Sequence, residues 1–258
     1  MATIPSHFTP FADVNAVLNQ LLSSARAILG DQFYAMVLYG SLASGDFDTE
    51  TSDIDFLIVT SDALSDGKIL ELKTMHEDLW KSDLKWAKKL EGRYLPKNEM
   101  RRHDPSYPPR PCLNEGCFYL AGEESDWIIN RHVIREQGIV LAGPNPKTLI
   151  EPVSPSEIQG AIEGYLREWW KPMLNRPARL DSSEYQSYAV LSMCRALYTL
   201  AHGTIASKLV SAHWAQQKFG ERWSGLIDLA LAWRPGMAMD IKNQTLDFIR
   251  FTVEQYRL

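Results

Sequence analysis

Two carboxylates lie close together in Ser52-Asp53-Ile54-Asp55, at the start of an apolar run that continues to Thr60. On a β-strand, residues i and i+2 share a face and lie roughly 7 Å apart. Asp53 and Asp55 can therefore converge on hard cations with oxygen ligands, as Mg²⁺ requires. An acid within an apolar run is also costly unless it is paired or metal-bound. We interpret the pair as a candidate metal site.

A loop rich in Gly, Ser and Asp precedes these acids and begins with Gly40-Ser41. Glycine lets the backbone approach a ligand closely, and serine offers a backbone N–H and a hydroxyl. Such a loop is most often only a turn, and one pair of nearby aspartates is common by chance. The two features side by side are more specific. They favour a phosphate-handling loop beside Asp53 and Asp55, and so chemistry on a nucleoside triphosphate.

The elements that must position these residues follow from the hydrophobic pattern. Apolar runs predict strands over residues 33–39 and 53–60, on either side of the loop. Helical spacing predicts a helix over 13–29, closed by a glycine, and another over 62–89. A further strand is expected over 90–95. The second strand is apolar on both faces, which is typical of a central strand in a sheet covered on both sides.

The chain then becomes less regular. Residues 97–116, with their prolines, predict an irregular connection, and 118–120 a short edge strand. A helix over 126–137 and a strand within 138–146 follow. Trp127 of that helix can line a substrate cleft, although aromatic packing explains it equally well.

A change of character near residue 153 predicts a domain boundary. Ser154, Pro155 and Glu157 provide an N-cap, an N1 proline and a capping-box partner for a helix. From there the strands stop, and helices are expected over 156–174, 184–202, 206–219, 223–233 and 240–256. The expected fold is an α/β domain with a mixed sheet and flanking helices over 1–152. An all-α bundle domain follows over 153–258.

Composition narrows the class of protein. The 258 residues are 45% hydrophobic and 23% charged, which is ordinary for a soluble globular protein. The longest apolar runs are too short to cross a bilayer, and residues 1–11 lack the pattern of a signal peptide. Three cysteines without a CxxC pair fit a reduced, cytoplasmic protein. The net charge of −5 argues mildly against nucleic acid as a partner and suits a cationic substrate. No membrane partner is expected, and we expect a monomer.

Three further charged residues are ambiguous when they are considered one at a time. Glu91 lies near the start of the strand expected over 90–95, where a surface acid is the simpler interpretation. Arg195 lies in an otherwise apolar helix, and Lys208 follows it at the start of another. Either cation can reach a triphosphate from the inner surface of a helical domain. For either one alone, a surface charge on a partly buried stem is the better explanation.

The motifs together resemble a known family. The stretch YGSLASGDFDTETSDIDFLIV resembles the signature of the nucleotidyltransferase superfamily of the DNA polymerase beta type. LEGRYLP and the spacing LxxCRxxYxxxxGxIxSK are similar to two motifs of the aminoglycoside adenylyltransferases that modify streptomycin and spectinomycin. These three motifs fall in the family's order, and the resemblance covers nearly the whole chain.

The resemblance implies a role for each candidate residue. Asp53, Asp55 and Glu91 would supply the metal-site carboxylates, with two Mg²⁺ ions, and Glu91 would be the general base on the attacking hydroxyl. Because an acid beside metals stays ionised, its position would matter more than a raised pKa. Arg195 and Lys208 would contact the phosphates of the co-substrate ATP. Gly40, Ser41 and Ser52 complete the expected nucleotide site, the two serines binding phosphate oxygens.

The family also implies the acceptor and the alternatives. Its members move AMP from ATP to a hydroxyl of a cationic aminoglycoside or aminocyclitol antibiotic and release pyrophosphate. Streptomycin-modifying members carry acids and a histidine before the arginine helix, and here Tyr185 and Tyr188 stand closest to those positions. That change concerns the acceptor and leaves the ATP and metal chemistry untouched. The alternatives are adenylylation of a protein or of another small molecule, and a non-catalytic binding protein on the same fold.

Overall fold

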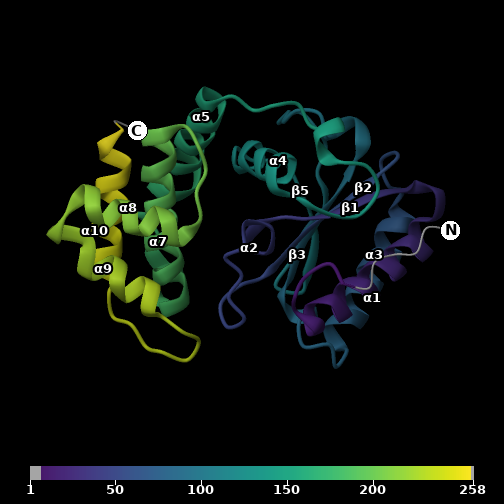
Figure 1. The fold of residues 1–258 in the computed structure, drawn as a ribbon, viewed down its shortest axis with the longest axis horizontal. Coiled ribbons are helices and arrows are strands. Elements are labelled where there is room, and N and C mark those ends of the chain that lie inside the picture. Colours follow the sequence, from purple (N-terminus) through teal and green to yellow (C-terminus); the bar gives the residue numbers. More distant parts are fainter. Residues whose placement is uncertain (1–6, 257–258) are drawn as a thin grey trace. The chain divides into compact units, whose positions relative to one another are not determined.

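The chain divides into two compact units in a computed structural model that describes residues 7–256 (Figure 1). One unit contains the residues up to Asp48 together with Ser52–Pro152. The other contains Thr49–Thr51 and the residues from Val153 onward. Residues 1–6 lie outside the described residues. They are part of the segment 1–11 from which the absence of a signal peptide was predicted.

The first unit is built around one six-stranded sheet with the order β5-β4-β3-β2-β1-β6. Its strands β2 and β3 are parallel and the other neighbours are antiparallel, so the sheet is mixed, as predicted. The strands are β1 Phe33–Leu38, β2 Ile54–Thr60, β3 Leu90–Pro96, β4 Arg110–Asn114, β5 Cys117–Ala121 and β6 Ile139–Ala142. The helices are α1 Ala12–Leu29, α2 Gly40–Ser44, α3 Asp66–Lys81 and α4 Asp126–Gln137, with short turns η1 Gly30–Gln32, η2 Ala87–Lys89, η3 Lys97–Glu99 and η4 Pro146–Thr148.

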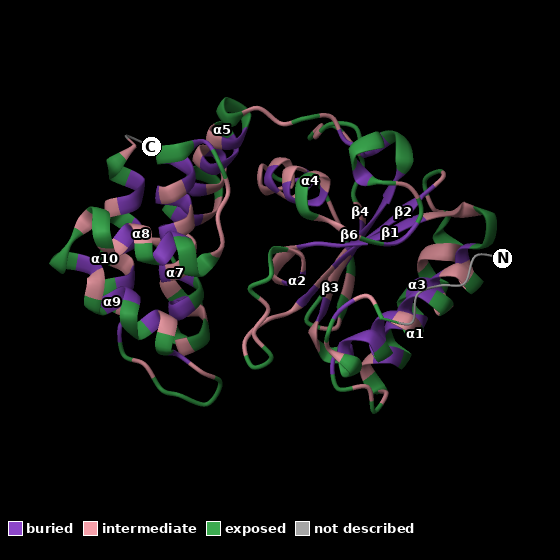
Figure 2. Ribbon diagram, viewed as in Figure 1, coloured by how far each residue is buried: buried purple, intermediate pink, exposed green. Residues whose placement is uncertain are grey.

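One face of the sheet forms the main core of this unit. Ile54, Phe56 and Ile58 are fully buried there, because their side chains alternate along β2 and point toward the same side. They pack in one cluster with the apolar stripes of α1 and α3, which cover this face (Figure 2). Gly92 of β3 lies so close to this cluster that a Cβ there would meet the Phe56 ring at 2.6 Å.

The opposite face of the sheet carries the charged residues, and α4 packs against it. Leu57 of β2 is fully buried on this side, and Arg93 of β3 stacks its guanidinium 4.7 Å from the centre of the Trp127 ring of α4. Gly138, the residue that ends α4, approaches Val37 of β1 so closely that a Cβ would lie 2.7 Å from its side chain. Because β2 lies between β1 and β3 and is covered on both sides, its prediction as a central strand is confirmed.

Three local predictions in this unit were wrong. Residues 97–116 were expected to be irregular but contain β4, and 40–44 form the short helix α2 rather than a loop. Pro111 is tolerated in β4 because pairing with β3 is confined to Leu113 and Cys112. The helix expected over 62–89 ends at Lys81, where the next residue is extended.

The second unit is entirely helical in its described part, and α7 is its central element. The buried residues of α7 face the helices that surround it, among them α5, α8, α9 and α10, and Figure 2 shows the buried stripe along it. The elements are α5 Pro155–Tyr165, the π-helical turn η5 Leu166–Trp170, α6 Lys171–Met173, η6 Pro177–Asp181, α7 Ser183–His202, α8 Lys208–Phe219, α9 Glu221–Ala232 and α10 Lys242–Gln255.

The helix expected over 156–174 is therefore interrupted. Pro172 lacks a backbone N–H and cannot continue an ordinary α-helical ladder, and the wider π-helical turn precedes it. The predicted capping box is present in full, since the Ser154 hydroxyl accepts from the Glu157 N–H and the Glu157 carboxylate accepts from the Ser154 N–H.

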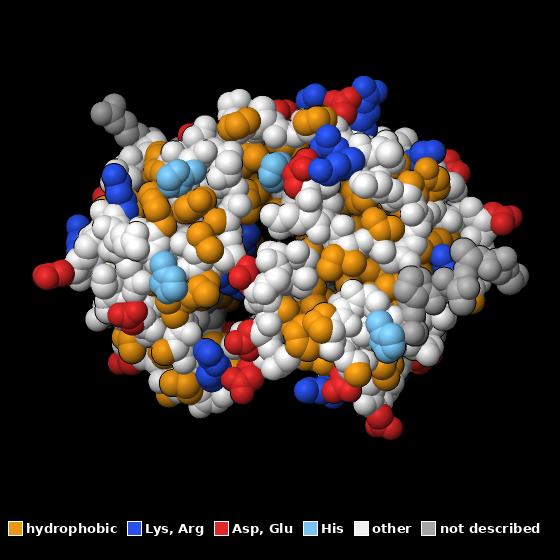
Figure 3. Space-filling view, viewed as in Figure 1, with side chains coloured by type: hydrophobic (Ala, Val, Ile, Leu, Met, Phe, Trp, Pro, Cys, Tyr) orange, Lys and Arg blue, Asp and Glu red, His pale blue; other side chains and the backbone are white. Residues whose placement is uncertain are grey.

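Within residues 7–256, the helices fall short of the length and apolar character that a membrane span needs. On the face that Figure 3 shows, acidic and basic side chains are interspersed. Cys112, Cys117 and Cys194 are free thiols.

Candidate functional site

The two strands that carry the predicted acids are neighbours and run in the same direction. In their register Asp55 of β2 is opposite Glu91 of β3, so the two side chains lie on the same face of the sheet. Asp53 directly precedes β2 on the side where both strands begin. Residues far apart in the sequence are thus brought to one end of one sheet, on the face that α4 covers. Asp53, Asp55 and Glu91 are all partly exposed.

The charge at this end of the sheet is poorly compensated. The pKa of Glu91 is raised from 4.5 to about 8, mainly by burial and also by the negative charges of Asp53, Asp55 and Glu115, against the lowering effect of Lys89. A carboxyl with this pKa holds a proton tightly when no cation is bound nearby. The raised value differs from the ionised base expected from the sequence, because that expectation assumed bound metal ions.

Gly40 fixes the Asp55 carboxylate from the loop side. The residue has a φ of +64°, and a Cβ there would lie 1.9 Å from Asp55 Oδ2. The preceding Tyr39 donates its backbone N–H to the Asp55 carbonyl oxygen at 3.1 Å. Gly40 is therefore required both for its backbone conformation and for the space that the carboxylate occupies.

The two serines predicted to bind phosphate lie at either end of the connection between β1 and β2. Ser41 is in the first turn of α2, and its carbonyl accepts the N–H of Asp46 at 3.1 Å. Ser52 closes a tight turn with Asp48, whose N–H donates to the Ser52 hydroxyl at 3.0 Å. The Ser52 N–H donates in return to the Asp48 carbonyl, also at 3.0 Å. Ser52 therefore shapes the loop immediately before Asp53.

The residues present suit a divalent cation held jointly with a substrate. Asp53 and Asp55 offer hard carboxylate oxygens, and their negative charges are among the causes, after burial, that raise the pKa of Glu91 beside them. In the described part of the chain, no group of three or more His, Cys, Asp or Glu side chains is gathered closely enough to hold a metal by itself. Mg²⁺ is usually bound by one or two carboxylates, water and substrate phosphates, so a complete protein cage is not required.

Arg93 and Asp126 were missed by the sequence analysis. Arg93 is 1% exposed, donates to the Gly122 carbonyl at 2.6 Å and also to the Ala121 carbonyl. Burial raises the pKa of Asp126, at the start of α4, to about 6, while Arg93 lowers it. The two charges also influence Tyr39, so they lie beside the acids. The alternation along β3 puts Arg93 on the face of Glu91, and that signal was available from the sequence.

The predicted cations belong to the helical unit. Arg195 lies on α7, two helical turns after Tyr188 and so on nearly the same side of the helix. Lys208 is the first residue of α8, and its ammonium lies 5.8 Å from the centre of the Tyr188 ring. The Tyr188 hydroxyl lies 3.3 Å from that of Tyr165. Within this unit Lys208 therefore lies over a tyrosine whose hydroxyl meets that of Tyr165 on α5.

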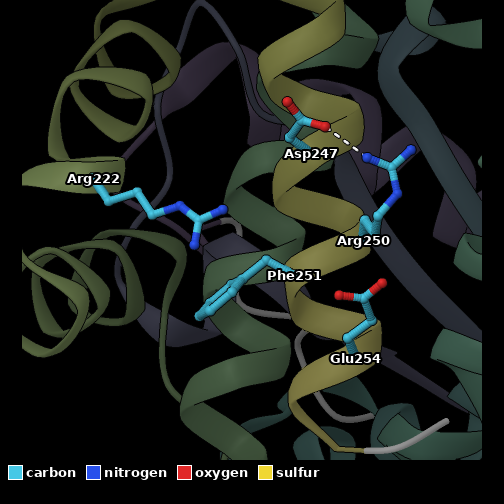
Figure 4. Close-up of a pocket in the computed structure, with 5 residues that line it drawn as sticks. All are labelled: Arg222, Asp247, Arg250, Phe251 and Glu254. Carbon is cyan, nitrogen blue, oxygen red and sulfur yellow. Dashed lines mark hydrogen bonds and ion pairs between the residues drawn. The ribbon is translucent and has the colours of Figure 1, made fainter.

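A surface pocket of the helical unit lies elsewhere, between α9 and α10 (Figure 4). Its lining mixes both charges around an aromatic ring and consists of Arg222, Asp247, Arg250, Phe251 and Glu254. Arg250 donates to Asp247 at 2.7 Å, as the dashed line in Figure 4 marks. None of these five residues belongs to the predicted site.

Comparisons with protein-family models divide the chain in the same order as its sequence motifs. Residues 20–108 match the nucleotidyltransferase domain. Residues 148–255 match the C-terminal domain of aminoglycoside adenylyltransferases.

Curated relatives and a solved structure are similar along most of the chain. A spectinomycin 9-adenylyltransferase of Campylobacter jejuni is 28% identical over 236 residues, covering 83% of this chain and 82% of the relative. An aminoglycoside (3'') (9) adenylyltransferase of Escherichia coli is 24% identical over 241 residues, covering 84% and 83%. The fold is similar to a crystal structure of spectinomycin adenyltransferase AAD(9) from Enterococcus faecialis with ATP and spectinomycin. The TM-score is 0.72 at 18% identity, over 93% of this chain and 98% of that one.

Proposed function

Because the chain belongs to the aminoglycoside adenylyltransferase family of the nucleotidyltransferase superfamily, we propose that it moves AMP from ATP to a hydroxyl group of an aminoglycoside or aminocyclitol antibiotic. The reaction releases pyrophosphate, depends on Mg²⁺ and confers antibiotic resistance. We also propose that residues 1–152 form the nucleotidyltransferase domain and 153–258 the helical substrate- and nucleotide-binding domain. The enzyme is expected to act in the cytoplasm as a monomer.

The observation that carries this proposal is the meeting of Asp55 and Glu91 across two parallel strands, with Asp53 at the same end. Burial of Glu91 and the negative charges of Asp53 and Asp55 raise its pKa, and gathering acids in this way is costly for folding unless the site has a use for the charge. Transfer of a phosphoryl-type group from a nucleotide provides that use, since it needs positioned acids and charge compensation more than covalent catalysis.

Each acid has a distinct role in the proposed reaction. Asp53 and Asp55, with help from Glu91, would hold Mg²⁺, which would supply positive charge to the phosphate oxygens. Glu91 also accepts the proton of the acceptor hydroxyl. The acceptor oxygen then bonds to the α-phosphorus, the bond from that phosphorus to the bridging oxygen breaks, and pyrophosphate leaves with the electron pair.

The remaining residues bind the nucleotide. Ser41 and Ser52 bind phosphate oxygens through a backbone N–H or a hydroxyl, and Gly40 leaves room for Asp55 beside them. Arg195 and Lys208 compensate the charge of the triphosphate. The Tyr188 ring beneath the Lys208 ammonium supports this, because it limits the positions that a long, flexible side chain can take.

The experiment that tests this function follows the AMP group by mass. The protein is incubated with ATP, Mg²⁺ and a panel of aminoglycosides and aminocyclitols that includes spectinomycin and streptomycin. We expect an AMP adduct on at least one drug and an equal amount of pyrophosphate. An adduct on protein in place of a drug would establish the alternative of protein adenylylation. The absence of any adduct would overturn the enzymatic proposal.

A further inference from the structure

The Asp53 carboxylate already has a cation beside it in the described structure. Lys89 Nζ lies 3.1 Å from Asp53 Oδ1. The register of the parallel strands explains the contact. Ile54 of β2 is opposite Leu90 of β3, and Asp53 and Lys89 directly precede these two residues. The short turn η2, which ends at Lys89, leads into β3 and delivers the lysine to this position.

Lys89 also acts on Glu91, the acid two residues after it. Among the charges that set the pKa of Glu91, Asp53, Asp55 and Glu115 raise it and Lys89 lowers it. A divalent cation bound to the same acids would have the same effect with greater charge. The lysine side chain is 40% exposed and that of Asp53 is 39% exposed, so their pairing is worth little in water and can be given up at small cost.

We propose that Lys89 is a resident cation that positions the Asp53 carboxylate in the nucleotide-free protein and is displaced from it when a divalent cation binds. This inference rests on the proposed function, in which Asp53 is a metal ligand. An ammonium beside Oδ1 occupies one of the carboxylate lone pairs that a metal could take, and its positive charge repels the metal ion. The protein therefore binds divalent cations weakly until ATP brings the negative charge that favours the exchange.

The first test is a titration of the nucleotide-free protein with Mn²⁺, in which the free ion is counted by electron paramagnetic resonance. In bulk water, two unit charges about 4 Å apart repel by an amount equal to about a five-fold change in an equilibrium constant. Lys89→Met should therefore bind Mn²⁺ at least about five-fold more tightly than the wild type. Lys89→Arg, which keeps the charge, should stay within about two-fold of it.

Lys88→Met is the matched control for charge and position. It removes the same charge one residue away, from an exposed ammonium that lies 5.9 Å from the centre of the Trp80 ring. We expect this variant to bind Mn²⁺ like the wild type. Equal tightening in the Lys88 and Lys89 variants would overturn the proposal, because the effect would then be one of net charge alone.

The second test detects displacement in the unmodified protein. A brief pulse of acetic anhydride, followed by peptide mass spectrometry, measures how reactive each lysine amine is. Saturating Mn²⁺ should increase acetylation of Lys89 at least about two-fold and leave Lys88 unchanged, because the Lys89 amine loses its carboxylate partner. Unchanged acetylation of Lys89 with Mn²⁺ bound would overturn the proposal.

Asp53→Asn separates this inference from the function on which it rests. If the wild type binds Mn²⁺ and Asp53→Asn does not, the metal assignment stands and the Lys89 variants alone decide the proposal. If Asp53→Asn binds Mn²⁺ as the wild type does, Asp53 is not a ligand, and both the metal assignment and the role of Lys89 fail. The transfer of AMP in the drug panel would still be judged by its own assay.

Discussion

Replacing Gly40 with alanine tests whether the position of the Asp55 carboxylate limits the reaction. Gly40 has a φ of +64°, and an added Cβ would lie 1.9 Å from Asp55 Oδ2 and 2.8 Å from its Cγ. Cβ atoms in proteins essentially never approach another heavy atom within 3.0 Å, so the carboxylate oxygen must move by about 1.1 Å, the difference between 3.0 and 1.9 Å. The new methyl group therefore displaces the acid without removing it.

Two costs follow from this change. A non-glycine residue in the left-handed region costs about 1–2 kcal/mol of stability. A displacement of about 1 Å at a reacting centre can lower a rate by roughly 100-fold. We therefore expect Gly40→Ala to remain folded at 25 °C but to transfer AMP at about one-hundredth of the wild-type rate. Initial rates of pyrophosphate release, with thermal denaturation measured in parallel, give both quantities.

Gly45→Ala is the matched control for backbone strain. Gly45 has a φ of +82°, and nothing lies within 4 Å of the Cβ that alanine would add. It should lose a similar amount of stability and keep a rate within a few-fold of the wild type. Equal rates in the two variants, whether both normal or both low, would refute the reasoning that the Asp55 contact is what matters.

Three further predictions follow from the first unit. Glu91→Gln should bind ATP normally in calorimetry and lose transfer by at least about 100-fold, because the amide cannot accept the hydroxyl proton; weaker ATP binding with unchanged transfer would contradict the base role. Burial lowers the pKa of His76 from 6.5 to about 3. Between these two pH values the unfolded chain therefore carries a proton on His76 that the folded chain lacks. The contribution of His76 to stability is therefore lost as pH falls below 6.5, by about 2 kcal/mol at pH 5. Urea denaturation of the wild type and His76→Gln in parallel isolates this contribution, because Glu91, whose raised pKa acts in the opposite direction, is common to both. The difference in stability between the two proteins should change by about 2 kcal/mol between pH 7 and pH 5, and an unchanged difference would contradict the account. Arg131→Met should destabilise the protein by about 3 kcal/mol in thermal denaturation, because the Glu123 carboxylate, 2.8 Å away and 3% exposed, would remain buried without its partner. A double variant with Glu123→Leu should recover part of the loss but not all of it, because the Glu99 and Met100 carbonyls, which also accept from Arg131, still lack this donor.

Much of the first unit could be predicted because its central strands have a simple pattern. Ile54, Phe56 and Ile58 alternate with residues of the other face, and this period fixes both the strand and the side on which Asp55 lies. The prolines in residues 97–116 led us to miss β4. Pro111 is acceptable there because of how β4 pairs with β3 and β5, and local sequence does not reveal that pairing. The end of α3 was also misjudged: Ser82 is extended, and both its N–H and its hydroxyl donate to the Leu79 carbonyl.

The candidate site was predictable to different depths. Residue type and spacing alone marked Asp53 and Asp55 as a candidate metal site. Glu91 could not be told from a surface acid until the parallel register put it opposite Asp55. The contact of Lys89 with Asp53 was invisible in the sequence, because it depends on how two separate strands are aligned. Pairing across strands far apart in the sequence is the information that local patterns lack.

The central claim is that the acids at this end of the sheet act together in the transfer of AMP, and Asp55→Asn tests it most directly. The measurement is the initial rate of AMP transfer from Mg²⁺-ATP to the drug that gives the largest adduct with the wild type. If Asp55 holds Mg²⁺, the rate should fall by at least about 100-fold while the variant keeps the thermal stability of the wild type or exceeds it. A variant that transfers AMP at the wild-type rate would contradict the claim.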